Sequence, residues 1–354
     1  MTHFSKIFAS ALLASGSFVV SAPVFAEAKP TVIRFASPSV GTGNRPVSAG
    51  TFYASVQSKA LFESEFKKDG IKVQWNNFKG AGPAINESFA NNLVDITWLG
   101  DLPAIIGKAS GLNTKLLLIS GTKIDTYVAV PAGSSAKSLQ DLKGKRIAIH
   151  KGTTYHLAAT KVLKKYGLTE RDFRFVNMDT HAAQSALASG DIDAVWSASN
   201  LLTLEARGVA KIVYSTVKEP DLYGSSGYVL ANASFEQKYP ETVQRIVDVL
   251  VKQASWDSNP ANKTELLKTW AQAGTPFAIL NKAYANTNFN RYSSPLFDDY
   301  AVSLIKHNLK SGQELKLIRG NVDVDKWIEP KYLNNALKKY NLGNVWKPLS
   351  VNGT

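Results

Sequence analysis

The loop at residues 149–156 contains the amino-acid types that bind an oxyanion. It reads Ile-His-Lys-Gly-Thr-Thr-Tyr-His: an apolar run ends, a glycine permits a tight turn, and two hydroxyls precede a helix. The first N–H groups of a helix lack partners and carry the positive end of its dipole, so they attract an anion. The alternative is a plain threonine N-cap that binds no ligand. The candidate ligand-binding residues of this loop are Lys151, Gly152, Thr153, Thr154 and His156.

Four other loops add hydroxyl, guanidinium and aromatic groups. Arg45 suits a bidentate pair with a sulfonate, sulfate or phosphonate, and otherwise is a solvated surface side chain. Asp101 is a helix N-cap, beside amide groups that can still contact a ligand. The aromatic residues Trp98, Tyr155, Trp196 and Tyr228 either line an apolar wall for an organic tail or pack in the core. The further candidate residues are Ser37, Arg45, Gly100, Asp101, Leu102, Trp196, Ser199, Ser225 and Tyr228.

The composition excludes several kinds of chemistry. The 354 residues include no cysteine and five scattered histidines, so thiolate zinc sites, iron–sulfur clusters and cysteine nucleophiles are excluded. We therefore expect no metal and no cofactor. No G-x-S-x-G, H-E-x-x-H or P-loop pattern occurs, so we expect a protein that is not an enzyme. The net charge of +13 attracts anions, but no cluster of five basic residues occurs, and we expect no nucleic-acid partner.

Short β-rich runs alternate with helical stretches, which predicts mostly parallel sheets flanked by helices. Ligands of such sheets bind beyond the carboxyl ends of the strands, where the candidate loops lie. We expect strands at residues 31–36, 71–78, 93–98 and 114–120, then at 145–150, 174–178, 192–196 and 210–215. From Pro240 onwards we expect a helical region, with helices at residues 241–255, 264–273, 278–285, 298–310 and 325–340.

A repeated pattern indicates two related α/β lobes. Asp95-x-x-Trp98 and Asp193-x-x-Trp196 each follow a helix, a polar turn and a branched apolar residue. We predict that residues 27–124 and 226–354 form lobe I, which includes the C-terminal helices, and that residues 125–225 form lobe II. The chain then crosses between the lobes near residues 121–130 and 221–232, which we expect to be loop-like hinges because they are rich in Gly, Tyr and Ser.

Residues 1–26 have the layout of a secretory signal peptide. A mildly basic start precedes an apolar run at residues 7–20, and Val24-Phe25-Ala26 ends the segment with small residues at the first and third positions. The alternative, a membrane anchor, conflicts with a run shorter than the roughly 20 residues that a bilayer requires. We expect export to the periplasm and cleavage near Ala26.

Five motifs together resemble the periplasmic substrate-binding proteins of ABC importers for sulfonates, taurine and nitrate. The resemblance covers roughly residues 30 to 250. Each motif is weak alone, and their combination is specific. They are Trp75-x-x-Phe78-x-Gly80-x-Gly82-Pro83, Asp95-x-x-x-x-Gly100-Asp101-x-Pro103, Asp141-Leu142-Lys143-Gly144-Lys145, Lys151-Gly152-Thr153-Thr154-x-His156 and Gly190-Asp191-Ile192-Asp193-Ala194.

This resemblance implies a two-lobed periplasmic-binding-protein fold of the type II-like class. It also implies that the loops ending at Gly100-Asp101 and Thr153-Thr154, with the return segment around Ser225, hold an anionic head group in the cleft. Two departures fall where the tail of the ligand is expected. Members often carry Trp-Asp-Pro where Ser199-Asn200 stands here, and residues 37–46 form a longer first loop.

We therefore expect the exported substrate-binding component of an ABC importer, acting as a monomer. It would capture a small organic anion, an aliphatic or aryl sulfonate, in the cleft between the lobes and deliver it to the membrane permease, which works with a cytoplasmic ATPase. The alternatives are a binder of nitrate, a phosphonate or a thiamine-precursor pyrimidine, or an enzyme that uses the same cleft with His156 as acid or base.

Overall fold

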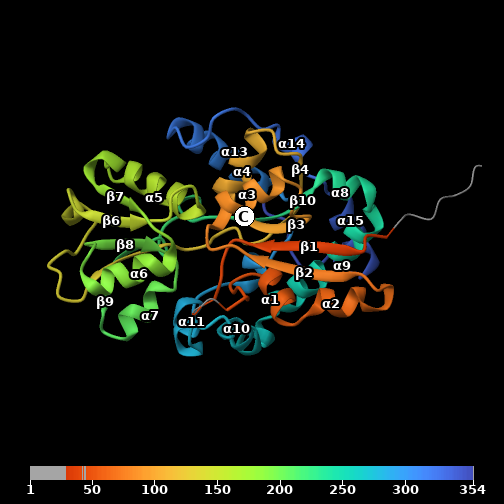
Figure 1. Cartoon of the computed structure of the whole chain (residues 1–354), viewed down its shortest axis with the longest axis horizontal. Coiled ribbons are helices and arrows are strands. Elements are labelled where there is room, and N and C mark those ends of the chain that lie inside the picture. Colours follow the sequence, from red (N-terminus) through yellow and green to blue (C-terminus); the bar gives the residue numbers. More distant parts are fainter. Residues whose placement is uncertain (1–28, 42, 44, 354) are drawn as a thin grey trace, which may run out of the picture.

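The computed structural model describes residues 29–41, 43 and 45–353. The predicted signal peptide, with its cleavage near Ala26, lies outside these residues. Within the described part, no helix is long and apolar enough to cross a bilayer. Two five-stranded sheets, each with helices packed on it, form the two lobes seen in Figure 1. The predicted two-lobed α/β fold class is confirmed.

The first sheet has the strand order β2-β1-β3-β10-β4 and is parallel except for β10, which runs antiparallel to both neighbours. Its strands are β1 (Val32–Ser37), β2 (Lys72–Asn77), β3 (Ile96–Gly100), β4 (Thr114–Ile119) and β10 (Gly227–Asn232). The helical segments between them are α1 (Phe52–Ser58), α2 (Leu61–Phe66), the 3₁₀ turn η2 (Lys67–Asp69), α3 (Ala81–Ala90) and α4 (Asp101–Ala109).

The second sheet repeats this plan in the order β7-β6-β8-β5-β9, and β5 is its antiparallel strand. The strands are β5 (Tyr127–Pro131), β6 (Arg146–Ile149), β7 (Arg174–Asn177), β8 (Ala194–Ser197) and β9 (Ala210–Ser215). Its helical segments are η3 (Gln140–Leu142), α5 (Thr154–Lys165), η4 (Glu170–Asp172), α6 (Thr180–Ser189), α7 (Leu201–Ala206) and η5 (Asp221–Tyr223).

The expectation of loop-like hinges at residues 121–130 and 221–232 is wrong for β5 and β10. Every residue of β10 is buried, and the first four residues of β5 are buried. A strand covered on both faces shows no alternation of apolar and polar residues, so the periodicity that marks a half-exposed strand is missing. The Gly, Tyr and Ser content that suggested flexible hinges belongs to the inner strands and the segments that lead into them.

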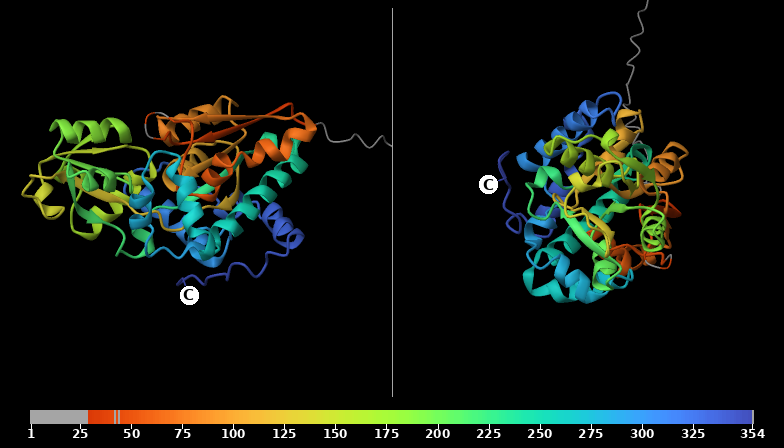
Figure 2. Two further views of the ribbon diagram at one scale, coloured as in Figure 1. Left: turned by 90° about the horizontal axis from the view of Figure 1, so that it is seen from below. Right: turned by 90° about the vertical axis from the view of Figure 1, so that its left-hand side faces the viewer.

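The helices after β10 pack around the first sheet, as Figure 1 and the left view of Figure 2 show. On one face, Val243 and Leu250 lie in the same core as Phe35, and on the other, Ile305 and Trp327 lie in the same core as the start of α4. These helices are α8 (Ala233–Lys238), α9 (Pro240–Ser258), η6 (Pro260–Asn262), α10 (Lys263–Ala271), α11 (Phe277–Ala283), α12 (Phe289–Tyr292), α13 (Asp299–Glu314), α14 (Val324–Trp327) and α15 (Lys331–Lys339).

Local signals fix where the helices of the second lobe begin and end. The Asp179 carboxylate accepts hydrogen bonds from the backbone N–H groups of His181 and Ala182 at 2.9 and 3.0 Å, which caps α6. Gly190 then ends α6 in the left-handed region at φ 84°. Gly152 adopts φ +76° before α5, so the tight turn predicted from the sequence is present.

Gly227 enters β10 at a point with no room for a side chain. An added Cβ would lie 2.4 Å from the carbonyl oxygen of Ser120 and 2.5 Å from the indole nitrogen of Trp98. Gly227→Ala is therefore expected to lower the free energy of unfolding by about 1–3 kcal/mol. Gly133→Ala, where no atom lies within 4 Å, is the control and should change it little. Urea unfolding followed by circular dichroism measures both, and equal stabilities would contradict the argument.

A buried carboxylate lies in the helical layer of the first lobe. Asp257, on α9, is fully buried and accepts hydrogen bonds from Gln253 Nε2 at 2.6 Å and Ser55 Oγ at 3.0 Å. Burial raises its pKa to about 7, although these two hydrogen bonds oppose the rise. The unfolded chain ionises this group near its ordinary pKa of 3.8, so folding and protonation are linked.

Asp257→Asn is expected to change how stability depends on pH. Between pH 4 and pH 7 the folded wild-type protein holds a proton that the unfolded chain has lost, so wild-type stability falls as pH rises through this window. The asparagine variant lacks this contribution. The free energy of unfolding of the variant minus that of wild type should therefore rise from pH 4 to 7 and level off above it. Urea unfolding at several pH values measures this, and a constant difference would contradict the raised pKa.

Candidate functional site

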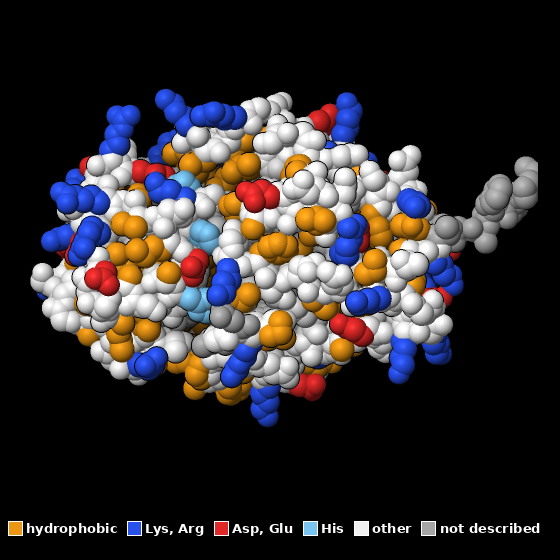
Figure 3. Space-filling model, in the orientation of Figure 1, with side chains coloured by type: hydrophobic (Ala, Val, Ile, Leu, Met, Phe, Trp, Pro, Cys, Tyr) orange, Lys and Arg blue, Asp and Glu red, His pale blue; other side chains and the backbone are white. Residues whose placement is uncertain are grey.

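The carboxyl ends of the parallel strands in the two sheets face each other. Tyr127, where the chain enters the second sheet, pairs with Ser197 at the end of β8. Gly227, where it returns to the first sheet, pairs with Gly100 at the end of β3. Loops at these strand ends are where α/β proteins bind ligands, so the region between the lobes is the candidate site. Figure 3 shows histidine side chains along this boundary, with Lys and Arg spread over the periphery.

Two antiparallel segments join the lobes. Ile124 and Ser225 exchange backbone hydrogen bonds of 2.8 and 3.0 Å, and Ser120 N–H donates to the carbonyl of Gly227 at 2.7 Å. Where the two segments reach the second sheet, Thr216 N–H donates to the carbonyl of Thr126 at 3.0 Å. We call residues 120–126 and 216–227 the crossing ribbon. The lobes are thus connected by a hydrogen-bonded pair of chains and not by two independent loops.

Asp101 is the first residue of α4 and Gly100 occupies the N-cap position, so the predicted N-cap role of Asp101 is wrong. The carboxylate of Asp101 joins α4 in the first lobe to α5 in the second. It is 1% exposed, and its Oδ1 accepts from Leu102 N–H at 2.7 Å and from the hydroxyl of Thr154. Its Oδ2 accepts from Ser226 N–H and from Asn308 Nδ2, both at 3.0 Å. Two predicted site residues therefore bind each other across the lobe boundary. The hydroxyl of Thr154 is donated to protein and is not available to a ligand.

A buried lysine that the sequence analysis missed completes this network. Lys161 Nζ donates to Asn308 Oδ1 at 2.9 Å and to the carbonyl of Gly224 at 3.1 Å. Burial lowers its pKa to about 8, opposed by the charge of Asp101. Burial likewise raises the pKa of Asp101, opposed first by Lys161. Lys161 lies seven residues after Thr154 and therefore on the same face of α5. This spacing is the sequence signal that could have identified Lys161 as a neighbour of the Thr154 site.

The His156 ring is held inside the second lobe. Its Nδ1 accepts from Gly152 N–H at 3.3 Å, so Nε2 carries the proton and donates to Glu170 Oε1 at 2.8 Å. This hydrogen bond and the imidazole together lower the pKa of Glu170. The Thr153 hydroxyl also turns inward and donates to the carbonyl of His150 at 2.6 Å. These side chains shape the loop at residues 149–156 and leave no free ring nitrogen for a ligand.

The first turn of α5 lacks a side-chain cap. Thr153 occupies the N-cap position, but its side chain makes no capping hydrogen bond. Earlier amides in the loop have partners, since Lys151 N–H donates to Asn177 Oδ1 at 2.9 Å. An added Cβ at Gly152 would lie 3.2 Å from Pro83 Cγ, so this loop directly faces the first lobe. The positive end of α5 is therefore directed to the lobe boundary without a carboxylate on its first turn.

Aromatic side chains lie beside this helix start. Burial raises the pKa of Tyr155 to about 12, and nearby Tyr284, from the segment after α11, raises it further. Tyr284 approaches α1 as well, because an added Cβ at Gly50 would lie 3.2 Å from its hydroxyl. A hollow in the second lobe opens next to Tyr155. Its lining residues are Ile149, His150, Tyr155, Met178, Thr180, Ala183, Val195, Trp196 and Ser197.

Of the other candidates in the second lobe and the crossing ribbon, Trp196 and Ser225 are buried and hydrogen-bonded within the protein. Trp196 Nε1 donates to Thr126 Oγ1 at 3.2 Å, and the Ser225 hydroxyl donates to the carbonyl of Thr154 at 3.4 Å. Ser199 is half-buried in the turn before α7. Trp196 alone of these three lines the hollow beside Tyr155.

The candidates of the first lobe divide between core and surface. Leu102 and Tyr228 belong to the core, where Tyr228 packs edge-on against Trp327. Ser37 is buried at the end of β1. Arg45 is exposed, and its Nη1 donates to the carbonyl of Gln272 at 3.2 Å. Within the described residues, no group of three His, Asp or Glu side chains suits a metal ion.

Gly100, the last residue of β3, lies directly against the first turn of α5 in the other lobe. An added Cβ there would lie 2.8 Å from Thr154 Cβ. A side chain at this position would push α5 away from Asp101. Gly100, which we predicted to be a ligand-binding residue, therefore allows the close contact between the lobes.

Asp101→Asn is expected to lower the free energy of unfolding by about 3–5 kcal/mol, because Lys161 loses the counter-charge that opposes its desolvation and must either stay charged and unpaired or release its proton on folding. Thr154→Val, which removes a single hydrogen bond to the charged carboxylate, should cost less, about 1.5–3 kcal/mol. The double variant Asp101→Asn/Lys161→Met should recover part of the loss. Chemical unfolding of the three variants measures this, and equal losses for the two single variants would contradict a charge-compensated network.

Comparisons with known proteins agree with this geometry. The family model described as NMT1/THI5 like matches residues 65–261. A candidate aliphatic sulfonates-binding protein of Bacillus subtilis (strain 168) is 28% identical over 293 residues, covering 81% of this chain and 85% of the relative. The 2'-hydroxybiphenyl-2-sulfinate desulfinase of Rhodococcus erythropolis is 27% identical over 164 residues, covering 46% of this chain and 44% of the enzyme.

A solved structure extends the similarity to nearly the whole fold. It is the periplasmic sulfonate-binding protein of a candidate sulfonate ABC transporter from Methylobacillus flagellatus KT. The two chains share 35% identity and a TM-score of 0.75, over 91% of this chain and 98% of the other. The resemblance inferred from the five sequence motifs is confirmed. The chain belongs to the NMT1/THI5-like family, in the periplasmic-binding-protein fold.

Proposed function

We propose that this chain is the exported substrate-binding component of an ABC importer and captures a small organic sulfonate between its lobes. Lobe I would consist of residues 27–124 and 226–354, and lobe II of residues 125–225. Residues 1–26 would direct export and be cleaved near Ala26, so that a monomer acts in the periplasm and delivers its ligand to a permease with its ATPase. The sulfonate-binding names of the relatives from Bacillus and Methylobacillus support this proposal.

The single observation that carries the proposal is the uncapped start of α5 at the lobe boundary. The helix has 12 residues, long enough to develop a dipole, and its N-cap side chain makes no hydrogen bond to the first turn. Asp101 and Asp179 accept from backbone N–H groups at the starts of α4 and α6. At α5 the Asp101 carboxylate accepts only from the Thr154 hydroxyl, so the backbone N–H groups of Thr154 and Tyr155 have no acceptor among the described residues and could serve an anion.

The neighbouring phenols suit a permanently ionised oxyanion. With its pKa raised to about 12, Tyr155 stays protonated at physiological pH and acts as a hydrogen-bond donor. Burial raises the pKa of Tyr284 in the same way. A sulfonate needs donors and no proton, so neutral amides and phenols are sufficient. The hollow beside Tyr155, which Trp196 and Met178 also line, is too narrow for a water molecule in this structure, so the organic tail would lie outside it, between the lobes.

Closure of the lobes would follow from ligand binding through a population shift. Donors from α5 and from Tyr284 belong to different lobes, and both can reach one oxyanion only when the lobes are together. Each hydrogen bond to a charged group contributes about 1.5–3 kcal/mol. Two or three of them supply about 3–9 kcal/mol before the cost of association, so contacts of the organic tail must contribute the rest of the about 8 kcal/mol that micromolar affinity requires.

A second candidate function is an enzyme that uses the same cleft, which the desulfinase relative favours. His156, the predicted acid or base, has both ring nitrogens engaged by Gly152 and Glu170. The chain has no cysteine to act as a nucleophile. These observations favour binding over catalysis. Nitrate, a phosphonate or a thiamine-precursor pyrimidine remain the alternative ligands and are included in the test.

The ligand class is tested by isothermal titration of residues 27–354 with ethanesulfonate, benzenesulfonate, taurine, nitrate, methylphosphonate and a thiamine-precursor pyrimidine. We expect at least one sulfonate to bind at micromolar concentrations or below, and the other classes to bind more weakly. Mass spectrometry of the ligand after incubation should show no product. Preferential binding of nitrate, phosphonate or pyrimidine would reject the sulfonate assignment, and a product would support the enzyme.

Tyr155→Phe tests the placement of the site. Loss of one hydrogen bond to a charged ligand should weaken sulfonate binding roughly ten- to hundred-fold. Tyr166→Phe is the matched control, because Tyr166 follows the other end of α5 and its hydroxyl donates to Glu219 at 3.0 Å. It should bind sulfonate as wild type does. If both variants bind equally tightly, the ligand does not lie at the start of α5.

A further inference from the structure

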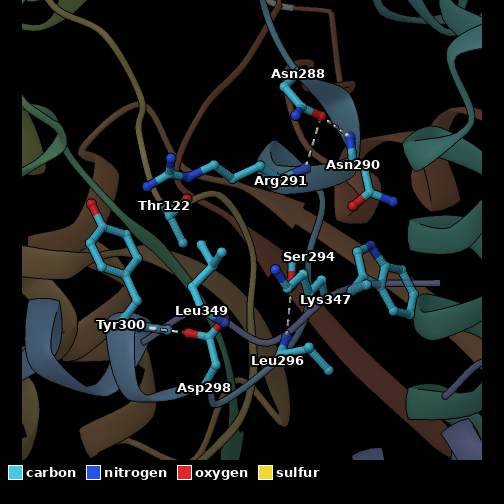
Figure 4. Close-up of a pocket in the computed structure, with 12 residues that line it drawn as sticks. Thr122, Asn288, Asn290, Arg291, Ser294, Leu296, Asp298, Tyr300, Lys347 and Leu349 are labelled. Carbon is cyan, nitrogen blue, oxygen red and sulfur yellow. Dashed lines mark hydrogen bonds between the residues drawn. The ribbon is translucent and has the colours of Figure 1, made fainter. Parts of the chain in front are cut away.

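A cavity of about 250 Å³ lies on the first lobe, next to the crossing ribbon and under the C-terminal segment. Figure 4 shows the Arg291 side chain extending along its rim toward Thr122 of the ribbon. None of the residues singled out in the sequence analysis lines it. Its lining residues are Thr122, Asn288, Asn290, Arg291, Ser294, Leu296, Asp298, Tyr300, Ala301, Trp346, Lys347 and Leu349.

The guanidinium of Arg291 is only partly paired. Its Nη2 donates to Asp221 Oδ2 at 2.7 Å, and Tyr300 donates its hydroxyl to the same oxygen at 2.7 Å. The Nε of Arg291 is buried and has no acceptor among the residues that the structure describes. Because this Nε has no accessible surface, a ligand in the cavity reaches the guanidinium through Nη1, for which the described residues offer no acceptor. A guanidinium binds carboxylate and sulfonate groups strongly, since the hydrogen bond is charge-assisted at both ends.

The opposite wall of the cavity is apolar. Leu296 and Leu349 lie below Arg291 in Figure 4, and Trp346 is buried, with its indole N–H donated to Ser258 Oγ at 2.8 Å. The acidic side chain in the lining, Asp298, is already satisfied. Its two oxygens accept from Ala301 N–H at 2.8 Å and Leu349 N–H at 3.0 Å. The cavity therefore offers a guanidinium that shares its charge with Asp221 at one end and an apolar wall at the other.

We propose that this cavity is a second binding site, for a small organic monoanion with an apolar body. The anionic group pairs with Arg291, whose Nη1 supplies the free donor, and the body packs against Leu296, Leu349 and Trp346. The site is separate from the start of α5 and does not depend on which ligand binds between the lobes. Lys347, exposed at the rim, adds positive charge at the entrance.

The test uses residues 27–354 with benzoate as the probe and neutral benzamide as its uncharged analogue. Benzoate should bind in calorimetric titration, and benzamide should bind at least ten-fold more weakly. Arg291→Gln should weaken benzoate binding at least ten-fold. Arg319→Gln is the matched control, since Arg319 is exposed and lies outside the cavity lining. It should bind benzoate within two-fold of wild type.

A crystal of the protein with 4-bromobenzoate then locates the probe. An anomalous bromine peak next to Leu296 and Trp346 supports the site. A peak only between the lobes, unchanged affinity of Arg291→Gln, equal binding of benzamide, or no benzoate binding each overturns it. Thermal unfolding of the unliganded variants accompanies the titrations. If Arg291→Gln is unfolded, the preference of the wild-type protein for benzoate over benzamide and the bromine position still decide between the outcomes.

Discussion

The contact between the two lobes depends on one buried carboxylate. Asp101 begins α4, yet three of its four hydrogen-bond donors come from elsewhere: α5, the crossing ribbon and α13. A carboxylate that is 1% exposed is tolerated only because these donors and the charge of Lys161 replace its water. The geometry of the lobe boundary, including the approach of Gly100 to Thr154, follows from keeping this charge satisfied.

This network also determines what is left for a ligand. Because the Thr154 hydroxyl is donated to Asp101 and the Thr153 hydroxyl to His150, neither caps α5. The start of α5 therefore keeps backbone N–H groups without a side-chain cap, while the hydroxyls of Thr153 and Thr154 donate to other groups of the protein. In the function proposed above, recognition of an anion at this place would rely on backbone amides and on protonated phenols such as Tyr155. Such donors accept a fixed negative charge without needing to exchange a proton with it.

The sequence predicted those parts of the fold that leave a local pattern. Eight strands, the turn at Gly152 and the helical region after Pro240 all appear near their predicted positions. The inner strands β5 and β10 were not predicted, because burial on both faces removes the alternation of apolar and polar residues that marks a strand in the sequence. Thr154 and Asp101 were correctly placed at the lobe boundary, but their mutual hydrogen bond spans 53 residues. Asn308, which is 207 residues from Asp101, carries no sequence signal that links the two.

The crossing ribbon has a mechanical consequence. Ile124 and Ser225 are bonded to each other in both directions, so neither chain can slide past the other without breaking these bonds. Any change in the angle between the lobes must therefore deform both chains together, and a substitution in one chain also alters the mechanics of the other.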